Sequence, residues 1–456
     1  MEKKTKEELL NKTKIPGINA IRMHKFYRGK IQVIPRCQIR DYNDFGIWYS
    51  PGVAATSTEI FHDASKVYDY TSKWNLVAVV SDGSRVLGLG NIGPEAAMPV
   101  MEGKALLFKY LGGVDAFPLC IGQKGCCEAE DIINFVKMIQ PTFGGINLED
   151  ISNPKCFTVL DKLRSDPEVN IPVWHDDQQG TASVTLAGLI NSLRIVGKEK
   201  DQIKIVFNGI GAANFRTYRL LKADGYNISN SIFVDSKGIL YKERSDLQSP
   251  QNYKYEVAEI SNREQVRGDC GKALEGADVL ISSSIPGPNI IKKEWISKMA
   301  DDAIVFALAN PIPEIFPWDA KEAGARIVAT GRSDFPNQVN NSLCFPGMFR
   351  GTLDVRATTI TDEMCIAASY SLADLVGEIQ GCFVDECILP TMQYENAFVK
   401  QAVAVGLKAI EQGIARIKLS EDELRSKSEE MITTSQEQFK LLMRKGYIPK
   451  FTDYEK

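Results

Sequence analysis

Short apolar runs alternate along the chain with longer segments in which apolar residues recur every three or four positions. The short runs are typical of buried strands and lie at 75–82, 144–147, 171–174, 203–208, 231–235, 277–284, 303–310 and 325–331. Strands separated by helices form parallel sheets, because each connection returns along one face of the sheet. The pattern therefore predicts an α/β protein with a parallel, doubly wound sheet.

The pattern differs at the two ends of the chain. From residue 349 onward the spacing is helical, over 350–376 and again over 397–414. The segment after Ser420 is rich in charge, and we expect it to form an exposed helix. Near the N-terminus, the run at 30–35 has the composition of a strand.

Composition excludes several classes of protein. The chain has 456 residues, a charged fraction of 25% and a net charge of −4. It therefore lacks the excess of basic residues that is typical of nucleic-acid-binding proteins. No apolar run reaches the roughly 20 residues that span a bilayer. Ten cysteines without a CxxC motif, and only three histidines, suggest no zinc site and a reducing compartment. The N-terminus has no apolar stretch of a signal peptide, so we expect a cytoplasmic protein.

Two carboxylate pairs follow two of the predicted strands. Glu149 and Asp150 come after the run GGIN, and Asp176 and Asp177 come after IPVW. Ligands of open α/β sheets bind at the carboxyl ends of the strands, and crowded carboxylates repel one another unless a cation lies between them. Oxygen ligands favour Mg²⁺ or Mn²⁺. The alternative is that each pair faces solvent or caps the next helix.

Two further side chains carry acid–base potential. Tyr49 precedes a Pro-Gly turn, where a tyrosine is either a packing residue or a general acid. Lys104 lies on an amphipathic helix, where a lysine is usually solvated. If the ammonium group instead points into a partly dry cleft, its pKa falls and it can act as a base. The Gly-rich segment 88–93 is followed directly by a proline, so we expect a tight turn rather than a phosphate-binding loop.

The segment 203–235 has the order strand, Gly-rich turn, helix, strand and acid that is typical of a dinucleotide-binding βαβ unit. Gly209 and Gly211 form the turn, and Asn214 replaces the third glycine. Asp235 ends the second strand, where an acid binds the ribose 2′-hydroxyl and repels a 2′-phosphate, which favours NAD. Ser236 and Lys237 follow at once and are suited to a phosphate, so NADP stays open.

With these residues assembled, the chain resembles the malic enzymes of the shorter bacterial and archaeal form. The resemblance rests on YSPGVA, the long block from NLVAVVSDGS to GVDAFPLC, GGINLEDI, WHDDQQGTA, GIGAAN, VDSKG, FALANP and NNSLCFPGMFRGTLDVRA. They extend in family order from about Tyr49 to about Gly413. The resemblance implies oxidative decarboxylation of malate to pyruvate and CO₂, with NAD or NADP, Mg²⁺ or Mn²⁺, and a homodimer.

The resemblance also implies a role for each matching residue. Tyr49 would be the general acid, Lys104 the general base, and Asp176 the partner of Lys104. Glu149, Asp150 and Asp177 would hold the metal. The coenzyme would contact Gly209, Gly211, Ala212, Ala213, Asp235 and Asn310, and the substrate would contact Asn310, Asn340 and Asn341. Asn214 and the segment SSSIPGP depart from the family pattern, which bears on coenzyme affinity and choice rather than on the chemistry.

The domains follow from the pattern and the resemblance together. We expect an N-terminal helical extension over 1–47, a substrate and metal domain over 48–175 plus 342–419, a Rossmann-type coenzyme domain over 176–341, and a C-terminal tail over 420–456. Three other functions stay open: a malolactic conversion of malate to lactate with tightly bound NAD, a non-catalytic dinucleotide sensor, and a metal-independent amino-acid dehydrogenase. Net NADH production and sensitivity to EDTA distinguish them.

Overall fold

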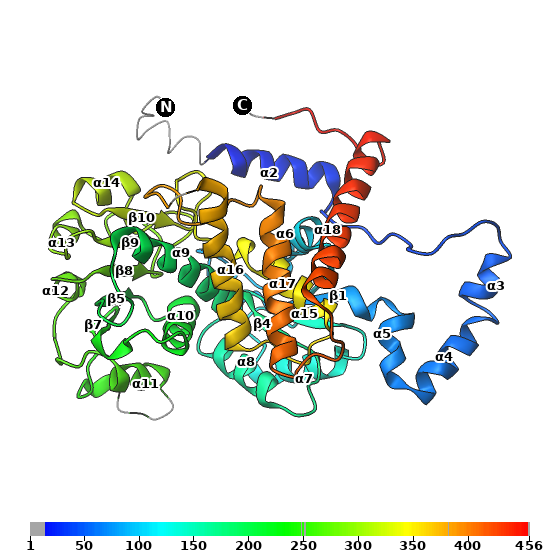
Figure 1. The fold of residues 1–456 in the computed structure, drawn as a ribbon, viewed down its shortest axis with the longest axis horizontal. Coiled ribbons are helices and arrows are strands. Elements are labelled where there is room, and N and C mark those ends of the chain that lie inside the picture. Colours follow the sequence, from blue (N-terminus) through cyan, green and yellow to red (C-terminus); the bar gives the residue numbers. More distant parts are fainter. Residues whose placement is uncertain (1–13, 248, 250–251, 382, 455–456) are drawn as a thin grey trace.

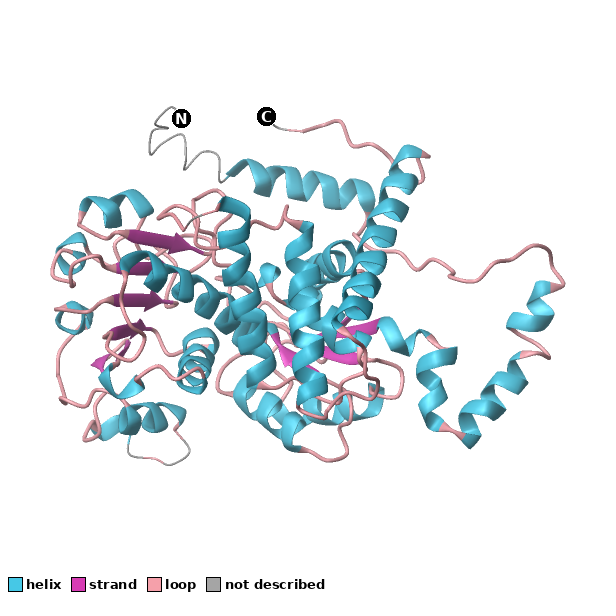
Figure 2. Cartoon of the chain, in the orientation of Figure 1, coloured by secondary structure: helices cyan, strands magenta, loops and turns pink. Residues whose placement is uncertain are grey.

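The computed structural model describes residues 14–454 except 248, 250, 251 and 382. Two parallel sheets lie side by side with helices around them (Figures 1 and 2). The predicted α/β class is therefore confirmed. In the described part of the chain, no helix is both long and apolar enough to cross a membrane.

The first sheet has four parallel strands in the order β2–β1–β3–β4. The strands are β1 (Leu76–Ser81), β2 (Asp115–Cys120), β3 (Gly145–Leu148) and β4 (Val173–His175). The helices that connect them are α6 (Pro94–Gly112), α7 (Ala129–Ile139) and α8 (Lys155–Ser165). β3 pairs with β4 so that Leu148 lies beside His175. Both carboxylate pairs therefore lie side by side at the carboxyl ends of β3 and β4.

The second sheet has six strands in the order β10–β9–β8–β5–β6–β7. They are β5 (Ile205–Asn208), β6 (Ile232–Asp235), β7 (Gly238–Ile239), β8 (Val279–Ser282), β9 (Ile304–Ala307) and β10 (Ile327–Thr330). Only β7 is antiparallel, at one edge. The helices are α10 (Ala212–Ala223), α11 (Tyr253–Ile260), α12 (Cys270–Leu274), α13 (Lys293–Ile296) and α14 (Pro317–Glu322). The chain reverses direction across the sheet between β5 and β8, the place where such sheets bind ligands.

Helix α9 (Thr181–Val196) joins the two sheets. Its residues 182–193 are all buried, so it has no solvent-facing side over most of its length. Small side chains allow this close contact, and a helix that is apolar all round belongs inside a protein. One continuous apolar core accordingly includes Val77 of β1, Leu189 of α9 and Phe207 of β5.

Four helices complete the body: α15 (Phe345–Asp354), α16 (Asp362–Gln380), α17 (Glu395–Glu411) and α18 (Glu421–Arg444). Ser420 and Glu423 form a capping box that fixes the start of α18. The prediction that this helix is simply exposed is wrong on one face. Leu424 and Ile432 are buried, and Ser435 donates to the carbonyl of Lys109 on α6 (2.7 Å).

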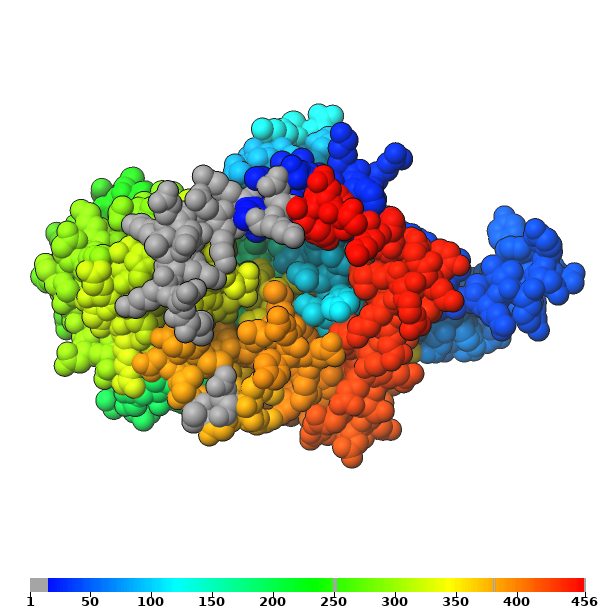
Figure 3. Space-filling model, turned by 90° about the horizontal axis from the view of Figure 1, so that it is seen from above, coloured from blue at the N-terminus to red at the C-terminus, as the bar shows by residue number. Residues whose placement is uncertain are grey.

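The N-terminal part of the chain contains α2 (Lys14–Tyr27), α3 (Asp44–Trp48), α4 (Val53–His62) and α5 (Val67–Tyr70). Helix α2 lies against the body, where the Tyr27 hydroxyl donates to the carbonyl of Pro449 at 2.8 Å, whereas residues 31–63, the N-terminal arm, extend away from it (Figures 1 and 3). The strand predicted at 30–35 is wrong, because these residues form exposed coil with no strand beside them to pair with. No residue of α4 is buried, and large apolar side chains are exposed at Ile47, Trp48 and Phe61. An exposed apolar arm of this kind marks an interaction surface.

Candidate active site

Lys104 is the centre of the acid cluster. It lies on α6 and is only 8% exposed. Its Nζ is 2.6 Å from Asp176 Oδ2 and 3.1 Å from Glu149 Oε1, and it lies 4.4 Å from the centre of the Phe345 ring. Burial by itself lowers the pKa of Lys104, but the charges of Asp176 and Glu149 outweigh burial and raise it. The expectation that a dry cleft would lower this pKa is therefore wrong for the structure as it stands, because the carboxylates hold the ammonium form.

Asp176 is held from both sides at the end of β4. Trp174 Nε1 donates to Asp176 Oδ1 at 2.9 Å, while Lys104 donates to Oδ2. The chain then forms one turn of π-helix, η3 (Asp176–Gly180), a rare element that is frequent at functional sites. This turn brings Gly180 back over the carboxylate, and a Cβ at Gly180 would lie 2.0 Å from Asp176 Oδ1. Only glycine fits there while Asp176 keeps its position.

The remaining acids lie next to this pair. Glu149 follows β3, is 4% exposed and accepts a hydrogen bond from Asn147 Nδ2 (2.9 Å). Asp150 adopts a left-handed backbone with φ of +54°. Its N–H donates to Asp177 Oδ2 at 2.9 Å, which places the Asp177 carboxylate against the Asp150 backbone. The structure thus brings Lys104 and all four predicted acids together.

The electrostatics of these acids fit a divalent cation. Burial, followed by the charge of Asp177, raises the pKa of Asp150 to about 8, and burial also raises the pKa of Glu149. Asp150 Oδ2 is buried without a hydrogen-bond partner. Among the described residues, no three His, Cys, Asp or Glu side chains are arranged as a ready-made metal site. The donors are all carboxylates, as Mg²⁺ and Mn²⁺ prefer, and Asp177 is partly exposed.

His175 lies under the cluster. It is fully buried, and neither ring nitrogen has a hydrogen-bond partner. Burial lowers the pKa of His175 to about 4, so the ring is neutral at pH 7. Its Nδ1 is 3.7 Å from Asp177 Oδ2, too long for a hydrogen bond. A neutral, fully buried ring without polar partners fits a packing role.

One predicted substrate residue, Asn341, lies beside the acids, and the other two, Asn310 and Asn340, both contact Gly331. The position that a Cβ would take at Gly180 is 3.1 Å from Asn341 Cβ, so Asn341 lies next to Asp176. Asn340 accepts a hydrogen bond from the N–H of Ser342 and donates from Nδ2 to the carbonyl of Gly331 (3.3 Å). A Cβ at Gly331 would lie 2.6 Å from Asn310 Nδ2. Asn310 and Asn340 therefore meet at Gly331, and Asn341 lies at Gly180.

The Gly-rich segment 88–93 begins in a tight turn, as expected, in which the N–H of Leu89 donates to the carbonyl of Val86 at 2.9 Å. A Cβ at Gly88 would lie 2.8 Å from the carbonyl oxygen of Asn310. The N–H of Arg85 donates to the carbonyl of Asp150 at 2.9 Å. Residues 85–88 thus contact Asp150 on one side and Asn310, in the loop after β9, on the other.

The dinucleotide-type turn has the expected backbone. Gly209 has φ of +91°, which favours glycine, and Gly211 is the N-cap of α10. Asn214 explains how the third glycine can be absent: its Nδ2 donates to the carbonyls of Asn208 (3.1 Å), Gly209 (2.9 Å) and Ile281 (3.3 Å). This amide fastens the turn to β5 and β8. The N-terminus of α10 is suited to a pyrophosphate.

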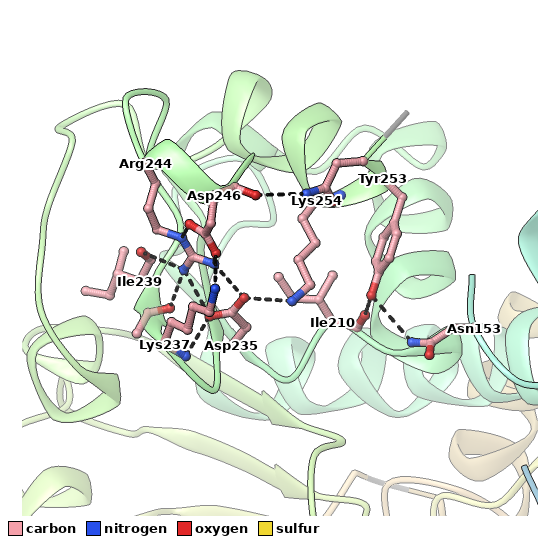
Figure 4. Close-up of polar contacts among 11 residues, drawn as sticks. Asn153, Ile210, Asp235, Lys237, Ile239, Arg244, Asp246, Tyr253 and Lys254 are labelled. Atoms are coloured by element: carbon pink, nitrogen blue, oxygen red, sulfur yellow. Dashed lines mark hydrogen bonds and ion pairs between the residues drawn. The ribbon is translucent and has the colours of Figure 1, made fainter. Parts of the chain in front are cut away.

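Asp235 has cationic partners that sequence analysis missed (Figure 4). Arg244 donates to both carboxylate oxygens, at 2.9 and 2.6 Å, and Lys254 donates to Oδ2 at 2.7 Å. Burial raises the pKa of Asp235, but Arg244 and Lys254 outweigh it and lower the pKa. Arg244 also pairs with Asp246 (2.8 Å). The charge that would repel a 2′-phosphate is therefore offset, and no local motif around VDSKG signals this.

Tyr49 is the predicted site residue that this chain does not bring to the cluster. It follows α3 on the N-terminal arm and is 76% exposed. The arm points away from the body in both views of the molecule (Figures 1 and 3). The acid cluster of one chain therefore lacks its predicted phenol.

Comparison with known proteins adds independent evidence. Residues 28–130 and 122–164 match the family model "Malic enzyme, N-terminal domain", and residues 178–410 match "Malic enzyme, NAD binding domain". The chain is 47% identical over 412 residues to a bifunctional malic/malolactic enzyme of Bacillus subtilis, covering 90% of this chain and 97% of the relative. It is 48% identical over 388 residues to an NAD-dependent malic enzyme of Geobacillus stearothermophilus, covering 85% and 78%. The crystal structure of Entamoeba histolytica malic enzyme is 45% identical, covers 99% of this chain and 93% of that chain, and superposes with a TM-score of 0.94.

Proposed function

The chain belongs to the malic enzyme family, and from this premise we propose how its residues oxidise and decarboxylate malate. The protein is an oxidoreductase that converts malate to pyruvate and CO₂ with a nicotinamide coenzyme. The observation that carries the assignment of roles is the buried ion-pair network of Lys104 with Asp176 and Glu149. A buried lysine next to acids at strand ends is the arrangement that the chemistry needs.

Lys104 is the general base in this proposal. Oxidation at C2 of malate removes the hydroxyl proton, which Lys104 Nζ accepts. A bound coenzyme would supply the acceptor for the C2 hydride. Lys104 must first give up its own proton, and Asp176 is placed to receive it at 2.6 Å. Asn310, Asn340 and Asn341 hold the malate with its hydroxyl toward Lys104.

Glu149, Asp150 and Asp177 are the proposed metal ligands. The orphaned Asp150 Oδ2 and the raised pKa of Asp150 and Glu149 support this role, because a cation would relieve both. When bound, Mg²⁺ or Mn²⁺ supplies positive charge beside the oxygen that becomes negative as the bond between C3 and C4 breaks. The protein residues then only have to keep water out and return one proton to C3.

Tyr49 returns that proton, and we propose that it comes from a second copy of the chain. The arm that carries it exposes Ile47, Trp48 and Phe61. Burying these side chains against a partner is favourable by roughly 25 cal/mol per Å² of apolar surface. In a homodimer in which each arm reaches the partner's acid cluster, the apolar side chains of the arm are buried and each cluster gains a Tyr49.

Absorbance at 340 nm tests the proposed function with malate, Mn²⁺ and either NAD or NADP. We expect malate-dependent formation of reduced coenzyme, one pyruvate per NAD(P)H, and loss of activity with EDTA that added Mn²⁺ restores. Absorbance that does not change, or activity that EDTA leaves intact, would contradict the proposed chemistry.

A malolactic conversion is the second candidate function, since the Bacillus subtilis relative is described as a bifunctional malic/malolactic enzyme. Reduced coenzyme that stays bound could return its hydride to pyruvate in the same site. Lactate formed from malate without net NADH would support this activity, and its absence under saturating malate would exclude it.

A further inference from the structure

Helix α11 begins at the dinucleotide turn with an unexpected contact. The Tyr253 hydroxyl donates to the carbonyl of Ile210 at 2.9 Å, and Ile210 is the middle residue between Gly209 and Gly211 (Figure 4). Burial raises the pKa of Tyr253, so the hydroxyl keeps its proton and stays a donor at neutral pH. This hydrogen bond fixes the carbonyl of Ile210, and the adjacent Gly209 and Gly211 would face the coenzyme pyrophosphate.

The Tyr253 hydroxyl also contacts the loop that follows β3 of the first sheet. Asn153 Nδ2 lies 3.5 Å from Tyr253 Oη, a long hydrogen bond (Figure 4). Asn153 is in the segment that links Asp150 to α8, and the N–H of Ser152 in that segment donates to Ser84 Oγ at 2.9 Å. Tyr253 therefore stands between the segment carrying the proposed metal ligands and the coenzyme turn.

Ring packing strengthens this connection. The Tyr253 ring is 5.0 Å from that of Phe157 on α8 and 5.3 Å from that of Phe215 on α10, and the two phenylalanine rings are 4.4 Å apart. Helix α8 follows the acid-bearing segment, and α10 follows the glycine turn. The three rings form one contact between the two sheets, so a shift of either segment moves Tyr253.

We propose that Tyr253 is a positioning residue that couples the coenzyme turn to the segment bearing the metal ligands, so that metal and coenzyme favour each other's binding. The inference rests on the proposed function. A bound cation would draw the carboxylates of Glu149, Asp150 and Asp177 toward one point, where without it they repel one another. The segment from Asp150 to α8 would shift with them, and its Asn153 and Phe157 would pass the shift to Tyr253 and the Ile210 carbonyl. Coupling of this kind is reciprocal.

Calorimetric titration without malate tests the coupling. NAD or NADP is titrated into the wild-type enzyme, Tyr253→Phe, and the matched control Tyr255→Phe from the same helix, each with and without Mn²⁺. In wild type we expect Mn²⁺ to tighten coenzyme binding about fivefold or more, a usual size for coupled sites. Tyr253→Phe should bind coenzyme about three- to tenfold more weakly, the worth of one hydrogen bond, and should lose the Mn²⁺ effect. Tyr255→Phe should match wild type.

A second variant and a separate assay make the outcomes distinct. Asn153→Ala leaves the tyrosine in place, and we expect it to keep coenzyme affinity without Mn²⁺ but to reduce the Mn²⁺ effect. A wild-type enzyme without any Mn²⁺ effect, or a Tyr253→Phe enzyme that keeps the full effect, would overturn the coupling. Thermal unfolding of each metal-free variant identifies a purely structural role, which would lower the melting temperature but leave the Mn²⁺ effect unchanged. Failure of malate oxidation in wild type would instead contradict the proposed function.

Discussion

Lys104 is the side chain on which the proposed chemistry depends most, because it is the proposed base for malate oxidation. Asp176 and Glu149 hold its ammonium group in place. Lys104→Ala should lower kcat for malate oxidation by about 10²–10⁴-fold, the usual worth of one acid–base group. Decarboxylation of added oxaloacetate bypasses the oxidation step, so it should fall less. The two rates are measured at 340 nm and by loss of oxaloacetate absorbance.

Tyr49→Phe is the companion variant, since it removes only the proposed proton donor to C3. It should slow tautomerisation of added enolpyruvate more than Lys104→Ala does. Equal loss of every partial reaction in both variants would contradict the division of roles. Residues that act as one unit give non-additive losses, so the partial reactions carry more information than the overall rate.

Asp235 is the residue that we expect to decide between the two coenzymes. Its position at the end of β6 predicts NAD, while Arg244 and Lys254 offset its charge. Asp235→Ser removes the carboxylate that offsets Arg244 and Lys254 beside the expected position of a 2′-phosphate, while Arg244 keeps Asp246, so kcat/KM for NADP relative to NAD should rise about tenfold or more. Asp246→Asn removes the same charge from the far side of Arg244 and serves as the control. An unchanged ratio in Asp235→Ser would exclude this residue as the determinant.

At the scale of elements, the turn η3 is the most demanding piece of backbone in the site. Gly180→Ala adds a Cβ at 2.0 Å from Asp176 Oδ1, so Asp176 has to move away from Lys104. We expect activity to fall about 10²-fold, as for other small misplacements of catalytic groups, and the free energy of unfolding to fall by about 1–3 kcal/mol. Steady-state kinetics and urea unfolding measure the two effects.

Gly103→Ala provides the matched control, one residue before Lys104 on α6. No atom lies within 4 Å of a Cβ built there. Alanine in a helix interior should stabilise the protein by about 0.5–1 kcal/mol and leave activity unchanged. If Gly180→Ala behaves like Gly103→Ala, the close approach of Gly180 to Asp176 does not matter for catalysis.

The elements of the site were largely predictable, and their close contacts were not. Acids directly after apolar runs predict acids at strand ends, and parallel pairing then brings Glu149 and Asp176 together. The need for glycine at 180 arises only when η3 folds the chain back over Asp176. Arg244 lies nine residues beyond Asp235 and Lys254 nineteen, with no periodic pattern linking them. Such partners depend on how loops and helices pack, which local sequence does not specify.

At the scale of the whole molecule, the N-terminal arm was the hardest part to predict. Its run at 30–35 has the composition of a strand but no neighbouring strand within the chain. The exposed apolar residues of α3 and α4 are typical of an interface, and the family resemblance predicts a dimer. The motif YSPGVA signals that Tyr49 is functional, and its distance in sequence from the acids fits a homodimer in which its segment reaches a partner's cleft.

A hybrid dimer tests most directly whether the active site combines Lys104 of one chain with Tyr49 of the other. Tyr49→Phe and Lys104→Ala chains with different affinity tags are co-expressed, and the hybrid is isolated by two purification steps and verified by native mass spectrometry. In such a hybrid, one site has both residues intact and the other has neither. We expect about half of the wild-type kcat per dimer, while each parent dimer stays at its low level. A verified hybrid no more active than its parents would contradict a site shared between two chains.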